Sequence, residues 1–326
     1  MAQRRVLVVP VHGGPEVLRT ETQPLADPGP DQLQVEVIAS GVNFIDVYQR
    51  QGIYPTKPPF ALGGEGAGRV VAVGSAVSGA QVGDVVAWVE TSGSHASLVN
   101  VVASRAVPVP AGVEPELAAA VMLQGITAHY LVTSTHPVAA GETALVHAAA
   151  GGVGQLLVQL IKARGARVVA TVSTPEKEAI ARACGADAVI RYTEVADLAA
   201  AVRSANDGRG VDVVYDGVGK DTFDASLASL RRRGLLALFG ASSGQVPPFE
   251  IQRLNSGGSL FLTRPTMADY IATREELLWR SGEILQAVGD GSLQVEIGGR
   301  YALDDAASAY AALEGRRTTG KLVLIP

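Results

Sequence analysis

A glycine turn between an apolar strand pattern and an amphipathic helix pattern constrains this chain more than any other feature. Residues 143–148 read TALVHA, Gly151, Gly152 and Gly154 follow, and apolar residues then recur at helical spacing. Such glycines let a backbone approach a pyrophosphate, whose charge is met by free N–H groups and the positive end of the helix dipole. Ala149 stands at the first glycine position of G-x-G-x-x-G, and a purely structural turn is the alternative. The strand, turn and helix together favour a dinucleotide site.

Helical patterns of ten or more residues alternate with short β-branched runs from about residue 115 onward. This alternation is typical of βαβ units and of a parallel sheet. Strands are predicted at 143–148, 166–172, 187–190, 211–216, 235–239 and 259–263. Six such strands predict an α/β fold with a doubly wound Rossmann sheet.

The first hundred residues have a different pattern, in which short strands are separated by turns rich in proline and glycine. Strands are expected at 6–9, 33–39, 68–74, 84–89 and 96–102. Their spacing suggests a small β-barrel-like domain. After a long helix over 273–288, strand character returns at 293–297 and 322–325, and both segments are expected to rejoin this first domain. The predicted limits are 1–122 with 295–326 for the β-rich domain and 123–294 for the Rossmann domain.

Composition and charge exclude several classes of protein. Hydrophobic residues make up 47% of the 326 residues and charged residues 18%, which excludes disorder for most of the length. A formal net charge of -5 provides no basic field for a nucleic acid. The single cysteine, Cys184, fits a reducing cytoplasm. The first apolar run is too short for a signal peptide, and glycines and an aspartate interrupt the apolar stretch 69–88, so no membrane segment is predicted.

The strand after the glycine turn lacks the acidic residue that would bind the ribose of NAD. The next helix is expected to begin at Thr174, with Pro175 in its first position, and Lys177 then falls in the first turn, where the helix dipole disfavours a cation. A 2′-phosphate would relieve this, with Ser173 and Tyr192 as further donors. The alternative is an exposed lysine between two glutamates. The pattern favours NADPH over NADH.

Several motifs resemble the medium-chain dehydrogenase/reductase superfamily. They are GVNFIDVYQRQGIYP at 41–55, GGEGAGRVVAVG at 63–74, AAAGGVG at 148–154 and VVYDGVG at 213–219. More narrowly, SLFLTRPTMADYIATREEL and the closing TTGKLVLIP resemble the bacterial NADPH:quinone oxidoreductases related to zeta-crystallin. The resemblance covers essentially the whole chain. It implies a Rossmann domain, a β-rich GroES-like domain, NADPH as cofactor, and a quinone or another electron-poor small molecule as partner.

Zinc alcohol dehydrogenases of this superfamily carry a cysteine ligand in G-V-C and a histidine ligand in G-H-E. This chain has Asn43 and Gly64 at those places and no four-cysteine loop, so both zinc sites are expected to be absent. Without a Lewis acid, alcohol oxidation has no obvious means of stabilising an alkoxide. The substitutions therefore select against an alcohol dehydrogenase.

The resemblance implies catalytic roles for Asn43 and Tyr54, in a cleft beside the nicotinamide that Asp46 and Tyr48 also line. Asn43 would donate to a ribose hydroxyl or a quinone oxygen, and Tyr54 would offer a stacking face and a hydroxyl. The alternatives are a helix cap for Asn43 and a turn aromatic for Tyr54. Together with the glycine turn, the expected cofactor-binding residues are Asn43, Thr127, Ala150, Gly151, Gly152, Val153, Gly154, Ser173, Lys177, Tyr192, Gly217, Phe239, Gly240, Ala241, Ser242, Leu262, Arg264 and Arg316.

The five histidines show no metal-ligand spacing, and His147, inside a predicted buried strand, is expected to be a hydrogen-bonded core residue rather than a catalyst. The predicted activity is the zinc-free transfer of reducing equivalents from nicotinamide C4 of NADPH to a quinone between the two domains. An enoyl or alkenal double-bond reductase and a non-enzymatic NADPH-binding redox sensor are the alternatives. Saturating an enone needs a proton at carbon, and the 41–55 segment has no histidine or lysine suited to that step, which favours a quinone.

The sequence also carries an expectation about assembly. By family resemblance the apolar strand 259–263 lies at an edge of the Rossmann sheet. An unpaired edge invites pairing, so two chains are expected to form a homodimer through it. Neither a nucleic acid nor a membrane is expected as a partner, and the predicted location is the cytoplasm.

Overall fold

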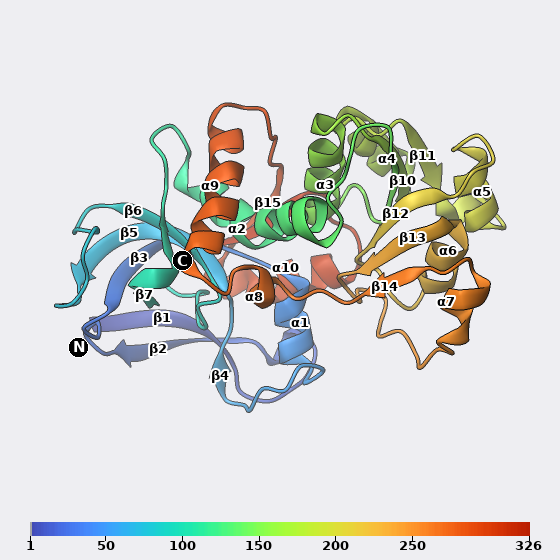
Figure 1. Ribbon diagram of the computed structural model, residues 1–326. Coiled ribbons are helices and arrows are strands. Elements are labelled where there is room, and N and C mark those ends of the chain that lie inside the picture. The colour runs from blue at the N-terminus through green and yellow to red at the C-terminus, as the bar shows by residue number, and fades with distance from the viewer. Residues whose placement is uncertain (1) are drawn as a thin grey trace. The chain divides into compact units, whose positions relative to one another are not determined.

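The computed structural model describes residues 2–326, which divide into two compact units (Figure 1). The first unit comprises the residues up to Ile126 together with Thr273–Pro326, and the second comprises Thr127–Ala272. Helix α9 (Arg274–Gly289) therefore belongs to the first unit, whereas the sequence grouped residues 123–294 with the Rossmann domain.

The first turn of α9 explains this difference. Arg274 Nη1 donates to the carbonyl oxygens of Ala103, Ser104 and Ala106 at 3.2, 2.7 and 3.1 Å. Three carbonyls around one guanidinium tie the start of the helix to the β-rich unit. The amphipathic pattern of a helix shows which of its faces is buried but not which domain buries it.

The second unit is built on a six-stranded parallel sheet with helices on both faces (Figure 1). Its strands are β9 (Thr143–Val146), β10 (Arg167–Val172), β11 (Ala188–Arg191), β12 (Val211–Asp216), β13 (Leu230–Leu238) and β14 (Phe261–Thr263). Its helices are α3 (Gly152–Ala163), α4 (Pro175–Ala183), α5 (Leu198–Ser204), α6 (Phe223–Ser229), α7 (Gln252–Ser256) and α8 (Met267–Tyr270). The order β11-β10-β9-β12-β13-β14 is that of a doubly wound Rossmann sheet, so this prediction is confirmed. In such sheets ligands bind beyond the carboxyl ends of the strands, where the order reverses between β9 and β12.

The first unit carries two sheets and confirms the predicted β-rich domain. A three-stranded sheet contains β1 (Ala2–Val9), β2 (Arg19–Leu25) and β4 (Phe60–Ala61). A seven-stranded sheet contains β3 (Gln32–Gly41), β5 (Glu65–Val73), β6 (Val85–Val89), β7 (Leu98–Val102), β8 (Ala106–Pro108), β15 (Ile297–Ala302) and β16 (Lys321–Ile325). Because β16 pairs with β3, the end of the described chain rejoins this unit as expected.

The strand predicted at 293–297 is wrong, because β15 begins only at Ile297. Leu293 is buried without being in a strand, since its N–H bonds the carbonyl of Ala287 at 2.9 Å and turns the chain back onto α9. The sequence also missed β2, whose residues RTETQPL are polar and mostly exposed. These residues form a strand because they pair with β1, although they show no alternation of apolar and polar residues.

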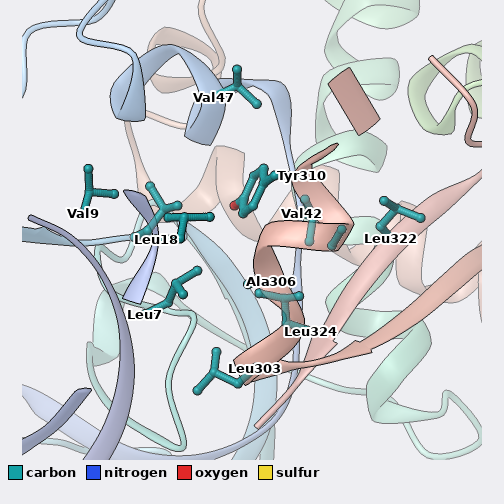
Figure 2. Close-up of a cluster of buried hydrophobic side chains, with 12 residues drawn as sticks. Leu7, Val9, Leu18, Val42, Val47, Leu303, Ala306, Tyr310, Leu322 and Leu324 are labelled. Carbon is teal, nitrogen blue, oxygen red and sulfur yellow. The ribbon is translucent and has the colours of Figure 1, made fainter. Parts of the chain in front are cut away.

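The core of the first unit joins α1 (Phe44–Arg50) and α10 (Ala306–Glu314) to the strands (Figure 2). The cluster consists of Leu7, Val9, Leu18, Val42, Val47, Leu62, Leu303, Ala306, Ala309, Tyr310, Leu322 and Leu324. Tyr310 brings the one hydroxyl of this set into the core, and its side chain is fully buried. A hydroxyl so placed needs a hydrogen-bond partner.

Helix α2 (Pro115–Tyr130) and the turn after it form a long apolar helical segment. Among residues 2–326, the span Pro115–Thr135 is the one helix long and apolar enough to cross a membrane by length and composition. Within the protein, however, 72% of its apolar window is buried. That burial is what the core helix of a folded domain shows.

Candidate active site

The glycine turn connects β9 to α3 as predicted. Gly151 caps α3 in an extended conformation, and Gly154 lies in the first turn of the helix. A Cβ at Gly154 would lie 2.8 Å from the Cα of Ala149 and would also collide with the carbonyl oxygen of Ala148. Only glycine therefore lets α3 pack this closely on the turn. The first N–H groups of a helix have no partner within it, and here they point out from a turn without side-chain bulk. The turn fits a pyrophosphate.

A second pair of turns lies at the same edge of the sheet. The carbonyl oxygen of Asp216, the last residue of β12, accepts hydrogen bonds from the N–H groups of Phe239 and Gly240 at 2.9 and 3.3 Å. Ser242 N–H donates to the carbonyl of Gly217 at 3.2 Å, and a Cβ at Gly240 would lie 2.8 Å from the Cα of Gly217. The structure therefore brings the predicted residues after β12 and after β13 together, beside the glycine turn after β9.

Two further predicted residues come from the neighbouring edge strand. Leu262 lies within β14, where it pairs with Leu236 of β13. Arg264 follows the strand and donates from Nη1 to the carbonyl of Leu238, the last residue of β13, at 3.0 Å. Both residues therefore end up at the carboxyl edge, while their contact with a nicotinamide stays a prediction.

The candidate 2′-phosphate residues gather beyond β10 and β11. Thr174 caps α4 and accepts the N–H of Lys177 at 3.3 Å, with proline in the first helical position as predicted. Tyr192, 40% exposed, begins the turn after β11. Thr193 Oγ1 donates to the carbonyl of Ser173 at 3.2 Å, which fixes this turn beside the end of β10. The positions fit the prediction, and the phosphate contact stays a prediction.

Asn43 does not fit the role that the resemblance implied. It caps α1 and is only 4% exposed. Its Nδ2 donates to Glu65 Oε1 at 2.6 Å and to the carbonyl of Gly41 at 3.1 Å, and its Oδ1 accepts from Lys321 Nζ at 2.7 Å. Both amide hydrogens are used inside the protein, so none remains for a ribose or a quinone oxygen. The helix-cap alternative describes Asn43 better.

Lys321 is the residue that the sequence patterns did not reveal. Its side chain is 1% exposed and pairs with the fully buried Glu65 at 2.5 Å. Glu65 Oε2 also accepts the N–H of Leu123 at 2.6 Å, and a Cβ at Gly41 would lie 2.7 Å from Lys321 Cε. The available signal was a lysine at the start of the apolar run KLVLI, because a buried ammonium requires an acidic partner. That partner lies 256 residues away.

The groups around Asn43 do not suit a zinc ion. At the two places where the resembling zinc enzymes carry ligands, this chain has an amide bonded to an ammonium and, at Gly64, no side chain. Zinc in proteins is bound by thiolates, imidazoles and carboxylates, and an ammonium repels it. Among residues 2–326, no three His, Cys, Asp or Glu side chains lie together as a metal-binding group.

Asp46 and Tyr310 form a second set of buried hydrogen bonds at the start of α1, next to those of Asn43 with Glu65 and Lys321. Asp46 Oδ2 accepts the N–H of Asn43 at 2.8 Å and the hydroxyl of Tyr310 at 2.9 Å. His95 Nε2 lies 2.8 Å from the same hydroxyl, and Ser40 Oγ lies 2.8 Å from His95 Nδ1. Burial, helped by the charge of Asp46, raises the pKa of Tyr310 well above its usual value. Asp46 is therefore committed to holding the start of α1 and does not line a cleft.

The other predicted residues lie apart in the chain. The Tyr54 ring packs 5.3 Å from the Tyr48 ring, centroid to centroid, and the residue is partly exposed. Arg316 follows α10 in the first unit, and Thr127, 7% exposed, lies in α2 at the start of the second. Their contacts with a cofactor or an acceptor stay predictions.

Comparisons with known proteins agree with this architecture. Residues 29–142 match the family model of the alcohol dehydrogenase GroES-like domain, and residues 152–277 match that of the zinc-binding dehydrogenases. A quinone oxidoreductase of Pseudomonas aeruginosa is 44% identical over 97% of both chains. A 2-haloacrylate reductase of a Burkholderia species is 38% identical over 98% of this chain and 99% of its own.

A solved structure shows the same fold. The quinone oxidoreductase of Escherichia coli, crystallised with NADPH, is 42% identical, with a TM-score of 0.97 over the whole of both chains. The resemblance drawn from the motifs is thereby confirmed. The chain belongs to the medium-chain dehydrogenase/reductase family, and among its members it is similar to the quinone oxidoreductases.

Proposed function

We propose that this protein is an NADPH-dependent quinone oxidoreductase. The observation that carries the proposal is the glycine turn before α3, which only glycine at 154 permits, in a chain similar along its whole length to quinone oxidoreductases. NADPH, when bound, supplies reducing equivalents from nicotinamide C4. The chain's own part is to hold the pyrophosphate on the N–H groups of α3 and to let the turns at Gly217 and Gly240 approach the rest of the dinucleotide.

Tyr54 is the residue that we assign to the acceptor. Its ring packs against Tyr48, so its orientation is restrained, and it remains partly exposed. An aromatic face and a hydroxyl suit a flat quinone. Asn43 supports this segment by capping α1 and has no free donor with which to polarise the acceptor.

Steady-state oxidation of NADPH with a panel of acceptors tests the proposal. We expect appreciable turnover with benzoquinones and naphthoquinones, followed by absorbance at the NADPH band, and weaker turnover with 2-alkenals at matched concentration. If no acceptor accelerates NADPH oxidation while NADPH still binds, the protein is a binder rather than an enzyme.

Double-bond reduction is the second candidate, because the Burkholderia 2-haloacrylate reductase is also similar along its full length. The same panel separates the two activities when it includes a 2-haloacrylate. An enzyme that used an alkene a hundred times more efficiently than every quinone tried would be a double-bond reductase.

Cofactor choice should depend on Lys177. Replacing Lys177 with alanine is expected to weaken NADPH binding by roughly 1 to 3 kcal/mol, about fivefold to 150-fold, with little effect on NADH, because only NADPH carries a 2′-phosphate. Lys162→Ala is the matched control. Lys162 pairs with Asp187, whose carboxylate binds the N–H of Val168 at the amino end of β10, so it lies at the opposite edge of the sheet. Equal losses for both cofactors in the Lys177 variant would contradict the assignment.

Dimerisation should use the exposed edge of the Rossmann sheet. Among the strands of residues 2–326, β14 pairs only with β13, and its Phe261 is 59% exposed. We expect sedimentation at micromolar concentration to show twice the chain mass of 33.6 kDa, and Phe261→Glu to shift the protein toward the monomer. Val82→Glu alters an equally exposed apolar residue of the first unit and should leave the dimer intact. A wild-type protein that sediments only as a monomer would exclude this edge as an interface.

A cytoplasmic location is part of the proposal. The single cysteine and a cofactor drawn from intracellular NADPH support it.

A further inference from the structure

A buried chain of hydrogen bonds joins the carboxyl ends of three neighbouring strands in the second unit. Thr171 Oγ1 of β10 lies 2.8 Å from His147 Nδ1, directly after β9. His147 Nε2 lies 3.0 Å from Ser226 Oγ of α6, and Ser226 Oγ donates to Asp216 Oδ2 of β12 at 2.7 Å. Each of these residues is at most 2% exposed. We call these four residues the His147 chain.

Asp216 ends the chain and shapes the turn that follows it. Its Oδ1 accepts the N–H groups of Val218 and Gly219 at 2.8 and 3.0 Å, and its Oδ2 accepts the hydroxyl of Thr222 at 2.7 Å. Together with the Ser226 hydroxyl, four donors surround this carboxylate, and both of its oxygens act as acceptors. The turn at 217–219 therefore takes its geometry from this side chain.

The carboxylate sets the direction of every hydrogen in the chain. Because the Ser226 hydroxyl donates its one hydrogen to Asp216, Ser226 Oγ can only accept from His147, which places an N–H on His147 Nε2. His147 Nδ1 is left to accept the hydroxyl of Thr171. Burial lowers the pKa of His147, against the opposing charge of Asp216, so the ring is neutral at pH 7. The expected state is one tautomer, with the hydrogen on Nε2.

Both ends of the His147 chain adjoin backbone turns assigned above to the cofactor. At the Thr171 end, the carbonyl of Thr171 accepts the N–H of Ala149 at 3.2 Å, and Ala149 belongs to the glycine turn that directly follows His147. At the other end, Gly217 directly follows Asp216. The four side chains belong to neither turn. They are buried, and their hydrogen bonds connect the glycine turn to the 217–219 turn.

We propose that the His147 chain is a positioning device for the dinucleotide, which holds the glycine turn and the 217–219 turn at the spacing that NADPH requires. Ser226, on α6, is its most indirect member, because it reaches both turns only through His147 and Asp216. Removing its hydroxyl breaks the connection and leaves the carboxylate its three other donors. The inference rests on the proposed function, since it concerns NADPH binding.

Ser226→Ala tests the proposal against Ser229→Ala. Ser229 lies on the same helix and is equally buried, but its hydroxyl donates to the carbonyl of Ala225 at 2.7 Å, within the helix. The measurements are NADPH affinity by calorimetric titration and melting temperature, both at pH 7. We expect Ser226→Ala to weaken NADPH binding about tenfold and Ser229→Ala less than twofold, with comparable losses of melting temperature. A purely structural serine would lower the melting temperature and leave the affinity of the folded protein unchanged.

Thr171 supplies a second test from the other end of the chain, should Ser226→Ala fail to fold. Thr171→Val keeps the shape and removes the hydroxyl, whereas Thr171→Ser keeps the hydroxyl. We expect the valine variant to bind NADPH several times more weakly and the serine variant to bind like the wild type. Nitrogen-15 NMR of His147 should show the Nε2–H tautomer in the wild type and a mixture of tautomers in Ser226→Ala.

The possible failures are distinguishable. A wild-type protein that binds no NADPH overturns the proposed function. A wild-type protein that binds NADPH, together with Ser226→Ala and Thr171→Val variants whose affinities lie within twofold of it, overturns this inference alone.

Discussion

Replacing Lys321 with methionine is expected to lower the free energy of unfolding by about 3 to 5 kcal/mol, because it leaves the carboxylate of Glu65 buried without its cation. Asn43 also loses the ammonium that its Oδ1 accepts from, which loosens the cap of α1. Urea unfolding followed by circular dichroism measures the change. Lys321→Met combined with Glu65→Gln should recover part of the loss, since no unpaired charge then remains buried.

Lys162→Met is the control for this prediction. Lys162 pairs with Asp187 at 2.9 Å, but the two side chains are 34% and 31% exposed. Ion pairs near the surface contribute about 1 kcal/mol or less, so this variant should change the stability little. Similar losses in the two variants would show that burial does not give the Lys321 pair its importance.

Replacing Gly154 with valine is expected to weaken NADPH binding by a hundredfold or more and to lower the free energy of unfolding by about 3 kcal/mol. A Cβ there meets the carbonyl oxygen of Ala148 and the Cα of Ala149, and backbone atoms cannot turn aside as a side chain can. The first turn of α3 must therefore move away from the turn that it caps. Calorimetric titration with NADPH and urea unfolding measure the two effects.

Gly282→Val is the matched control. Gly282 lies within α9, and apart from its chain neighbours and the backbone of its own helix, no heavy atom lies within 4 Å of a Cβ at this position. Since glycine is a poor helix former, this variant should change the stability by about 0.5 kcal/mol or less and leave NADPH binding intact. If Gly154→Val behaved in the same way, the close packing at the turn would not matter for the site.

The two units share one kind of buried polar chain. In the first, Ser40, His95 and Tyr310 lead to Asp46, which accepts the N–H of Asn43 at 2.8 Å. In the second, Thr171, His147 and Ser226 lead to Asp216, which accepts the N–H groups of the 217–219 turn. In each unit a hydroxyl, an imidazole and a second hydroxyl direct their hydrogens toward one carboxylate, and that carboxylate orders a backbone segment of the candidate site.

His147 shows which part of the buried network could be predicted from the sequence. A histidine inside an apolar strand pattern predicts a hydrogen-bonded core residue, and that prediction is confirmed by its burial and its two partners. The partners themselves lie 24 and 79 residues away along the chain. Nothing in the local pattern selects them, because hydrogen-bond partners across a sheet are chosen by strand order and register.

Local patterns in the sequence determined the Rossmann sheet, the glycine turn and the cap at Thr174, because each depends on residues within one strand, turn or helix of one another. The motifs, taken together, also determined the family. Only the tertiary structure decided that the side-chain amide of Asn43 hydrogen-bonds Glu65 and Lys321, and that α9 belongs to the β-rich unit. In both cases the partners are remote in the sequence, since Asn43 lies 278 residues from Lys321 and Arg274 lies 168 to 171 residues from the carbonyls that it binds. A buried amide, ammonium or carboxylate must be satisfied by whichever polar group the fold places beside it, and residues hundreds of positions apart become neighbours only when the strands pair.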